Sequence, residues 1–519
     1  MIYFNEKISP RQMFFMVLLG FSGVTCMYAT DLNVRYAGRY AVISIAITIL
    51  FAYLITALFL RMTKKLNFSS WNSGIKTCVF IVLGIKYSVL LVLLALSMVS
   101  LVKKEIIPDV SYFYICALIF IVILYVSGIN TEARARLLEV MFYPALIVLV
   151  LFFVFGMTKI HIYRLELGEL LKSGEGENLI GIVKAVVVNM LLFVHPEMAV
   201  LLIKRTEQHR RKSAGKAILS AILITGILNI LTYIETAGTL SVNMVRAKND
   251  SVIRLIKIFK MPYISFERQG GLFIIFFILS MFFAVICVTS YLGYSLGQCG
   301  FQNQKVKAGI FAVILAGGTI FLLNNSDYFA KIKEIHQRKI PIEKRLYAGF
   351  LLIDREQGEY QILLSFKTEY NGSKYRIMKV KDLENLQKQW ETTSEKHLDL
   401  SGVKAIMLTD ELVKDSRVKK QVLDFMENND ELSDNLLLCV TDSSFKQTDG
   451  EQPDNETVFD RDLGEYIESV ASQNIGKTES KFYRVSLVLY GTDKSCNLAR
   501  FHIGDKNVQY AGTTELSVN

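Results

Sequence analysis

The residues most suggestive of chemistry are two ionisable side chains beside a helix breaker in an apolar run. Residues 179–203 could cross a membrane, yet they contain His195, Pro196 and Glu197. Proline interrupts a helix, and ionisable groups deep in a membrane are expensive to keep without a task. The pattern favours a binding site here, and a simple proline kink is the alternative.

A second possible interruption lies in the first apolar run, where glycines and hydroxyl residues over 20–25 permit a helix to unwind. Transporters with two inverted five-helix repeats bind substrate between interrupted helices one and six, the positions of these two segments. Close helix packing explains the glycines equally well. The expected ligand-binding residues are Gly20, Gly23, Val24, Thr25, Asn189, Phe193, His195, Pro196 and Glu197.

Other charged residues also fall within apolar runs. Lys86 and Glu235 lie deepest, and we expect a structural ion pair between the third and seventh spans, with a coupling or gating role as the alternative. Glu139 and Lys184 lie near the ends of their spans, from where long side chains reach the membrane interface.

Familiar catalytic motifs do not occur in the sequence: it has no Walker loop, HExxH or GxSxG. We therefore expect no enzyme activity, no cofactor and no metal site. The seven cysteines show no metal-ligand spacing. Only Cys439 and Cys496 lie in the polar C-terminal part, where a disulfide would require an oxidising compartment. His397 is expected to be structural.

The composition combines two kinds of chain. Of 519 residues, 52% are hydrophobic and the mean hydropathy is +0.34, although 20% are charged. Apolar runs of about 20 residues, the length of a membrane helix, recur up to residue 323 and not beyond. We predict a membrane domain over 1–330, a linker over 331–345 and a mixed α/β soluble domain over 346–519. Because the net charge of +10 lies mainly in short loops, it indicates membrane topology rather than nucleic-acid binding.

The N-terminal part is predicted to be an α-helical polytopic membrane protein, a transporter-like inverted-repeat bundle of about nine spans. An odd number of spans places the two ends of the chain on opposite sides of the membrane. If the N-terminus is cytoplasmic, the loops on the cytoplasmic side hold more Lys and Arg than the outer loops, as the positive-inside rule requires. We therefore expect a cytoplasmic N-terminus and a C-terminal domain outside the cytoplasm. The spans are predicted at residues 12–29, 39–60, 77–102, 111–129, 138–157, 179–203, 217–240, 271–295 and 308–324.

Shorter patterns predict the remaining elements. Residues 346–353 and 360–366 are typical of a β-hairpin, and 403–408 and 436–440 of buried strands. Helical periodicity covers 381–390 and 411–427. An amphipathic helix over 252–259 is expected either in the membrane interface or packed on the helix bundle.

The membrane part resembles the B subunit of GerA-type spore germinant receptors, members of the amino acid, polyamine and organocation transporter superfamily. The resemblance covers about residues 6–335 and rests on residues 8–15 (ISPRQMFF), 136–144, Glu197, and 266–268 leading into 273–275. B subunits typically have ten spans, and the basic stretch 331–345 stands where the tenth would be.

The C-terminal part resembles the N-terminal domain of the C subunit of the same receptors, a lipoprotein outside the inner membrane. The resemblance rests on residues 346–354, 396–412, 424–426 and 435–440, including His397 and Asp410-Glu411-Leu412. The lipid-anchoring cysteine of that subunit is missing. Losing one span would move this domain outside, so the membrane part would replace the lipid anchor.

Together the two resemblances imply a spore germination receptor subunit in the inner membrane of a spore-forming bacterium. It would sense a small nutrient between spans one and six, with an amino acid as the leading candidate. It would then signal to partner subunits of the A and C types. Partnership with nucleic acid is not expected. The alternatives are a secondary transporter of amino acids and a scaffold with a vestigial pocket.

Overall fold

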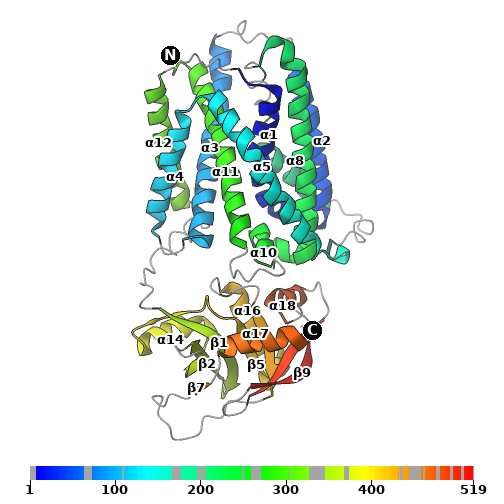
Figure 1. The fold of residues 1–519 in the computed structure, drawn as a ribbon, viewed down its shortest axis with the longest axis vertical. Coiled ribbons are helices and arrows are strands. Elements are labelled where there is room, and N and C mark those ends of the chain that lie inside the picture. Colours follow the sequence, from blue (N-terminus) through cyan, green and yellow to red (C-terminus); the bar gives the residue numbers. More distant parts are fainter. Residues whose placement is uncertain are drawn as a thin grey trace. The chain divides into compact units, whose positions relative to one another are not determined.

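The computed structural model consists of two compact units, Met1–Lys339 and Ile340–Asn519, each described by itself (Figure 1). The structure describes residues 7–62, 73–107, 110–165, 177–193, 195, 203, 206–247, 250–258, 270–301, 303–325, 345–367, 373–429, 432, 436–442, 458–459, 462–474, 480–490, 495–503 and 508–517.

The first unit is a bundle of apolar helices, and each predicted span overlaps one of them. Six segments are long and apolar enough to cross a membrane, and the first, Pro10–Met62, contains both α1 and α2. The shorter α4 and α6 are also apolar. The helices are α1 (Pro10–Ala37), α2 (Ala41–Met62), α3 (Ser73–Glu105), α4 (Tyr112–Ser127), α5 (Thr131–Met157), α6 (Glu177–Phe193), α8 (Arg211–Leu240), α11 (Gly270–Gln298) and α12 (Gln304–Asn325).

Helix α1 packs against α2, α5, α6, α8 and α11. It begins with a capping box, in which Ser9 Oγ accepts from Gln12 N and Gln12 Oε1 accepts from Ser9 N. Pro10 follows at the first helical position. It ends at Gly38, whose φ of 54° lets the chain turn into α2. The part of α1 from Met13 to Met27 is buried almost all round, and its residues are apolar or small on every face.

The expected unwinding of the first span over residues 20–25 is not found, because α1 is one continuous helix. The Thr25 hydroxyl donates to the carbonyl oxygens of Phe21 and Ser22, both at 2.9 Å, within its own helix. In the sixth span, α6 is described as far as Phe193, and His195 is not part of it, whereas the expected breaker Pro196 lies outside the described residues.

The amphipathic segment after α8 forms α9 (Val242–Ala247) and α10 (Ser251–Ile258). Helix α10 packs against α1, α8 and α11 with nearly all its side chains buried. Ser251 N donates to Asp31 Oδ2 at 3.1 Å, and Lys257 Nζ lies 3.0 Å from Glu105 Oε1. Of the two arrangements expected, the helix is therefore packed on the bundle.

The second unit is built on one mixed sheet with the order β7-β3-β2-β1-β5-β6-β8-β9, in which β4 also pairs with β1. The predicted hairpin forms from β1 and β2, and positive φ at Gln357 and Gly358 makes its turn. The strands β1, β5, β6 and β8 are parallel. The strands are β1 (Arg345–Glu356), β2 (Glu359–Lys367), β3 (Ser373–Val380), β4 (His397–Asp399), β5 (Ala405–Thr409), β6 (Leu437–Thr441), β7 (Val458–Phe459), β8 (Ser495–Ile503) and β9 (Val508–Ser517).

Helices cover both faces of this sheet. One face carries α14 (Leu386–Thr393), α16 (Ser416–Asn428) and α18 (Phe482–Leu489), and the other carries α17 (Leu463–Asn474). The single helix expected over 411–427 is two, α15 (Asp410–Lys414) and α16, because Asp415 caps Arg417 N and Val418 N.

Two smaller expectations concern single side chains of this unit. Cys439 and Cys496 are free thiols that belong to the hydrophobic clusters on opposite faces of the sheet, so they do not form a disulfide. His397 is buried, with its Nδ1 3.2 Å from Glu391 Oε1.

Candidate functional site

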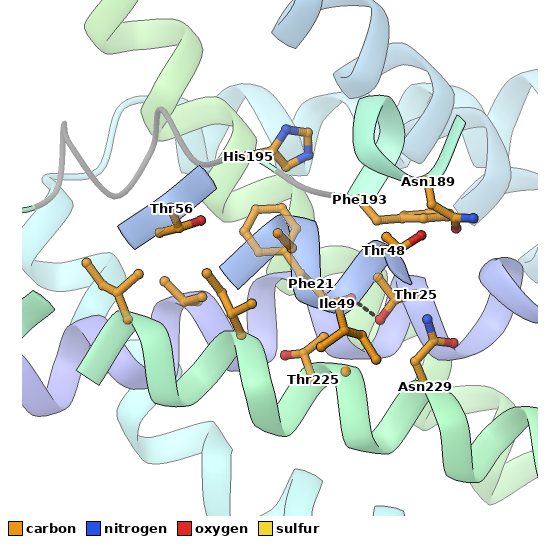
Figure 2. Close-up of a pocket in the computed structure, with 15 residues that line it drawn as sticks. Phe21, Thr25, Thr48, Ile49, Thr56, Asn189, Phe193, His195, Thr225 and Asn229 are labelled. Carbon is orange, nitrogen blue, oxygen red and sulfur yellow. Dashed lines mark hydrogen bonds between the residues drawn. The ribbon is translucent and has the colours of Figure 1, made fainter. Parts of the chain in front are cut away.

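A cavity of about 80 Å³ lies within the helix bundle, enough for a few water-sized groups or a small molecule (Figure 2). It is walled by α1, α2, α6 and α8 together with His195. Its lining residues are Val17, Phe21, Thr25, Thr48, Ile49, Ala52, Thr56, Asn189, Phe193, His195, Ile218, Ile222, Thr225, Gly226 and Asn229. We call this space the four-helix pocket.

Thr25, Thr48, Asn189 and Asn229 gather at one end of the four-helix pocket, its polar end, as Figure 2 shows. Thr56 lies toward the other end. Aliphatic side chains of α1, α2 and α8 make up much of the remaining lining. The lining residues include no Asp, Glu, Lys or Arg, so the described wall carries no fixed charge. A small molecule with a polar head and an apolar side chain matches this distribution.

A buried hydrogen-bond network positions the polar end. Asn33 Oδ1 accepts from Asn189 Nδ2 at 3.0 Å and from Ser44 Oγ at 2.5 Å. Asn189 Nδ2 also donates to Ala185 O at 2.7 Å. These side chains are at most 2% exposed and join α1, α2 and α6. Because both amide hydrogens of Asn189 are used, its carbonyl oxygen is left as an acceptor at the pocket.

Several polar atoms of the pocket wall are buried without a hydrogen-bond partner among the described residues. They are Thr56 Oγ1, Asn189 Oδ1, Thr225 Oγ1 and Asn229 Oδ1. Buried polar atoms are normally satisfied, and each one left unpaired costs about 1–3 kcal/mol. Because these four atoms share one cavity, a polar occupant, either water or a ligand with donors and acceptors, would satisfy them there.

His195 closes the pocket beside α1 and α3. Its ring centroid lies 5.0 Å from that of Phe21 and 5.9 Å from that of Tyr87, and the side chain is 8% exposed. It is the only ionisable side chain of the described lining. Pro196 and Glu197, expected beside it, lie outside the described residues.

Three residues expected at the site lie elsewhere on α1. A Cβ atom at Gly20 would lie 2.7 Å from Cys287 Sγ, and one at Gly23 would collide with Ser280, both of α11. The two glycines therefore permit close packing of α1 on α11. Val24 is buried but does not line the pocket.

The ion pair expected between Lys86 and Glu235 is not formed. Lys86 Nζ lies over the ring of Tyr87, 5.9 Å from its centroid, and both Glu235 oxygens are buried without a hydrogen-bond partner in the described structure. Lys184 is exposed, as expected for a residue near a span end. Glu139 instead pairs with Arg11 Nε at 3.1 Å and accepts from Gln12 Nε2 at 3.2 Å.

The sequence reasoning missed the walls contributed by α2 and α8. Thr48 and Thr56 are eight residues apart, and Thr225 and Asn229 four apart, so each pair lies on one helix face. Polar residues at helical spacing within apolar spans are the sequence signal of these two walls.

A helical membrane bundle with an internal pocket, followed by an α/β domain, defines an integral membrane protein of permease-like architecture. The family model described as spore germination protein matches residues 7–327, so the chain belongs to this family. A second model, spore germination protein N-terminal domain, matches residues 338–495. The suspected joining of B-like and C-like receptor parts is thereby confirmed. No curated protein matches the chain.

Proposed function

We propose that this germinant receptor-like membrane protein senses a small nutrient, in the first place a free amino acid, in the four-helix pocket. The observation that carries the proposal is the buried pocket, whose wall holds amide and hydroxyl oxygens without a hydrogen-bond partner among the described residues. The family match supports a role in spore germination.

The chemistry of the wall suits a zwitterion with a modest apolar side chain. The carbonyl oxygens of Asn189 and Asn229 can accept from an ammonium group, and the Thr225 hydroxyl can donate to a carboxylate. Val17 and Ile218 line the space for an apolar side chain. Since the described wall has no fixed charge, a molecule of zero net charge avoids an unpaired buried ion.

Signalling requires only that the nutrient bind one arrangement of the four helices more tightly than another. The α1–α6 and α1–α2 contacts are joined through Asn33, so a ligand that engages Asn189 is connected to three helices. The receivers of the signal are A-type and C-type receptor subunits. The protein is placed in the inner membrane of a spore former, with its C-terminal domain outside the cytoplasm.

The test is to delete the gene in a spore former, restore it as wild type or as Thr225→Val, and score germination on single amino acids. The proposal expects loss on at least one amino acid, rescue by wild type and reduced rescue by the variant. Normal germination of the deletion strain on every nutrient would overturn it. Labelled uptake into liposomes tests the transporter alternative, because robust accumulation would contradict a receptor without transport.

A further inference from the structure

Glu235 is a buried carboxyl group in α8. Its side chain is 2% exposed, and Oε1 and Oε2 both lack a hydrogen-bond partner in the part of the chain that the structure describes. It does not line the four-helix pocket. Its position on α8 is six residues beyond Asn229, about 9 Å along the helix axis.

The carboxyl of Glu235 lies directly against the backbone of α5. A Cβ atom at Gly156 would lie 2.5 Å from Glu235 Cδ, 2.6 Å from Oε1 and 2.8 Å from Oε2. Any residue other than glycine at this position would require the carboxyl to move.

The neighbouring helices bring no described cation to this carboxyl. On α1, Cys26 faces it as a buried thiol, and Asp31 accepts from Ser251 N of α10. Arg164, in the short helix Ile162–Leu165, directs Nη1 at Thr239 O, 2.7 Å away. On α10, Lys257 pairs with Glu105.

Other titratable groups do not supply a charge partner either. Tyr233 lies on α8 itself, two residues away, and a phenol carries no positive charge in either protonation state. The described residues contain no cluster of His, Cys, Asp and Glu that could hold a metal ion. The described ion pairs do not include Glu235.

We propose that Glu235 is a proton-binding site, at which the side chain is held as a neutral carboxylic acid at pH 7. An ionised carboxylate without partners in a membrane interior costs several kcal/mol, and binding a proton removes that cost. The closely packed contact with Gly156 keeps water away from the group. A movement of α8 away from α5 would admit water and let the proton leave, on the helix that also carries Thr225 and Asn229.

The experiment is infrared difference spectroscopy of the purified full chain in lipid nanodiscs at pH 7. The wild-type spectrum minus that of Glu235→Gln is expected to show the carbonyl stretching band of a protonated carboxylic acid. Glu411→Gln, which removes an exposed carboxyl of the second unit, serves as the control and is expected to show none. Absence of the band from the Glu235 difference at pH 7 would overturn the proposal.

A second variant covers the case in which Glu235→Gln does not fold. Gly156→Ala pushes on the carboxyl and is expected to shift the frequency of the same band, whereas Gly84→Ala, which meets no atom within 4 Å, is expected to leave it unchanged. An unshifted band in Gly156→Ala would contradict the assignment to Glu235. These measurements use no nutrient, so their failure is distinguishable from failure of the proposed function.

Discussion

Asn189 Nδ2 donates to Asn33 Oδ1 across 3.0 Å, and this bond joins α6 to α1 at the polar end of the four-helix pocket. Ser44 of α2 donates to the same oxygen, so one acceptor connects three helices. The bond also fixes which way the Asn189 amide points, and its oxygen has no hydrogen-bond partner in the part of the chain that the structure describes. One buried contact thus serves helix packing and the orientation of a candidate ligand group.

Replacing Asn33 by alanine should therefore cost stability, because one Asn189 donor is left buried and unpaired. We expect a loss of about 1 kcal/mol, which is typical of hydrogen bonds between membrane helices. The measurement is thermal unfolding of the purified chain in detergent. Asn325→Ala is the control, since Asn325 is exposed and donates only to Phe321 O of its own helix. Equal midpoints for both variants would show that the network contributes nothing.

Gly20→Ala tests whether the first glycine serves packing or the pocket. The added Cβ would press on Cys287 Sγ, so we expect destabilisation of about 1–3 kcal/mol. Gly293→Ala in α11 is the matched control: the new Cβ meets nothing within 4 Å, and alanine is the better helix former. Unfolding midpoints in detergent decide the matter. A Gly20→Ala chain as stable as the control would contradict the close α1–α11 contact.

The fold could largely be predicted from the sequence because hydrophobic length and period report directly on burial. Each predicted span overlaps a helix, and the β1–β2 hairpin follows from its alternation and turn. Single side-chain contacts that override a hydrophobic pattern are harder to predict from the sequence. Asp415 divides one expected helix into α15 and α16, and the α1 glycines serve close packing rather than unwinding.

The candidate site could be predicted only in part. Thr25, Asn189, Phe193 and His195 of the expected set line the pocket, although α1 is not interrupted at Thr25 and Pro196 lies outside the described residues. Whether α2 and α8 contribute to the pocket depends on which helices pack together, and a single sequence does not reveal that. The expected Lys86–Glu235 ion pair fails for the same reason, since Glu235 lies against Gly156 of α5 rather than against α3.

Cys439 provides a test of burial in the second unit. Burial raises the pKa of its thiol well above the ordinary value of 9.0, so the reactive thiolate stays scarce as the pH rises. We expect no alkylation of Cys439 in the native chain between pH 7 and pH 9, and rapid alkylation after denaturation. Peptide mass spectrometry provides the measurement. Native labelling that increases steeply over this range would show that the strand is accessible.

The orientation of the chain is tested by cysteine labelling in intact cells. Glu395→Cys places a thiol at an exposed position of the second unit, in a background lacking the exposed Cys78. If that unit lies outside the cytoplasm, as we propose, the new thiol should react with a membrane-impermeant maleimide before lysis. Lys212 is exposed in the first turn of α8, at the end expected to be cytoplasmic. Lys212→Cys should therefore react only after lysis. The reverse pattern would place the C-terminal domain inside.

Equilibrium binding of single free amino acids to the purified full chain tests the nutrient site most directly. Thr225→Val removes a pocket hydroxyl at nearly constant volume, and Thr319→Val removes a comparable buried, unpartnered hydroxyl from α12, outside the pocket lining. We predict that at least one amino acid binds, that Thr225→Val weakens its binding by about tenfold, equivalent to about 1.4 kcal/mol, and that Thr319→Val does not. Binding that neither variant alters, or no binding of any amino acid, would contradict an amino acid site in the four-helix pocket.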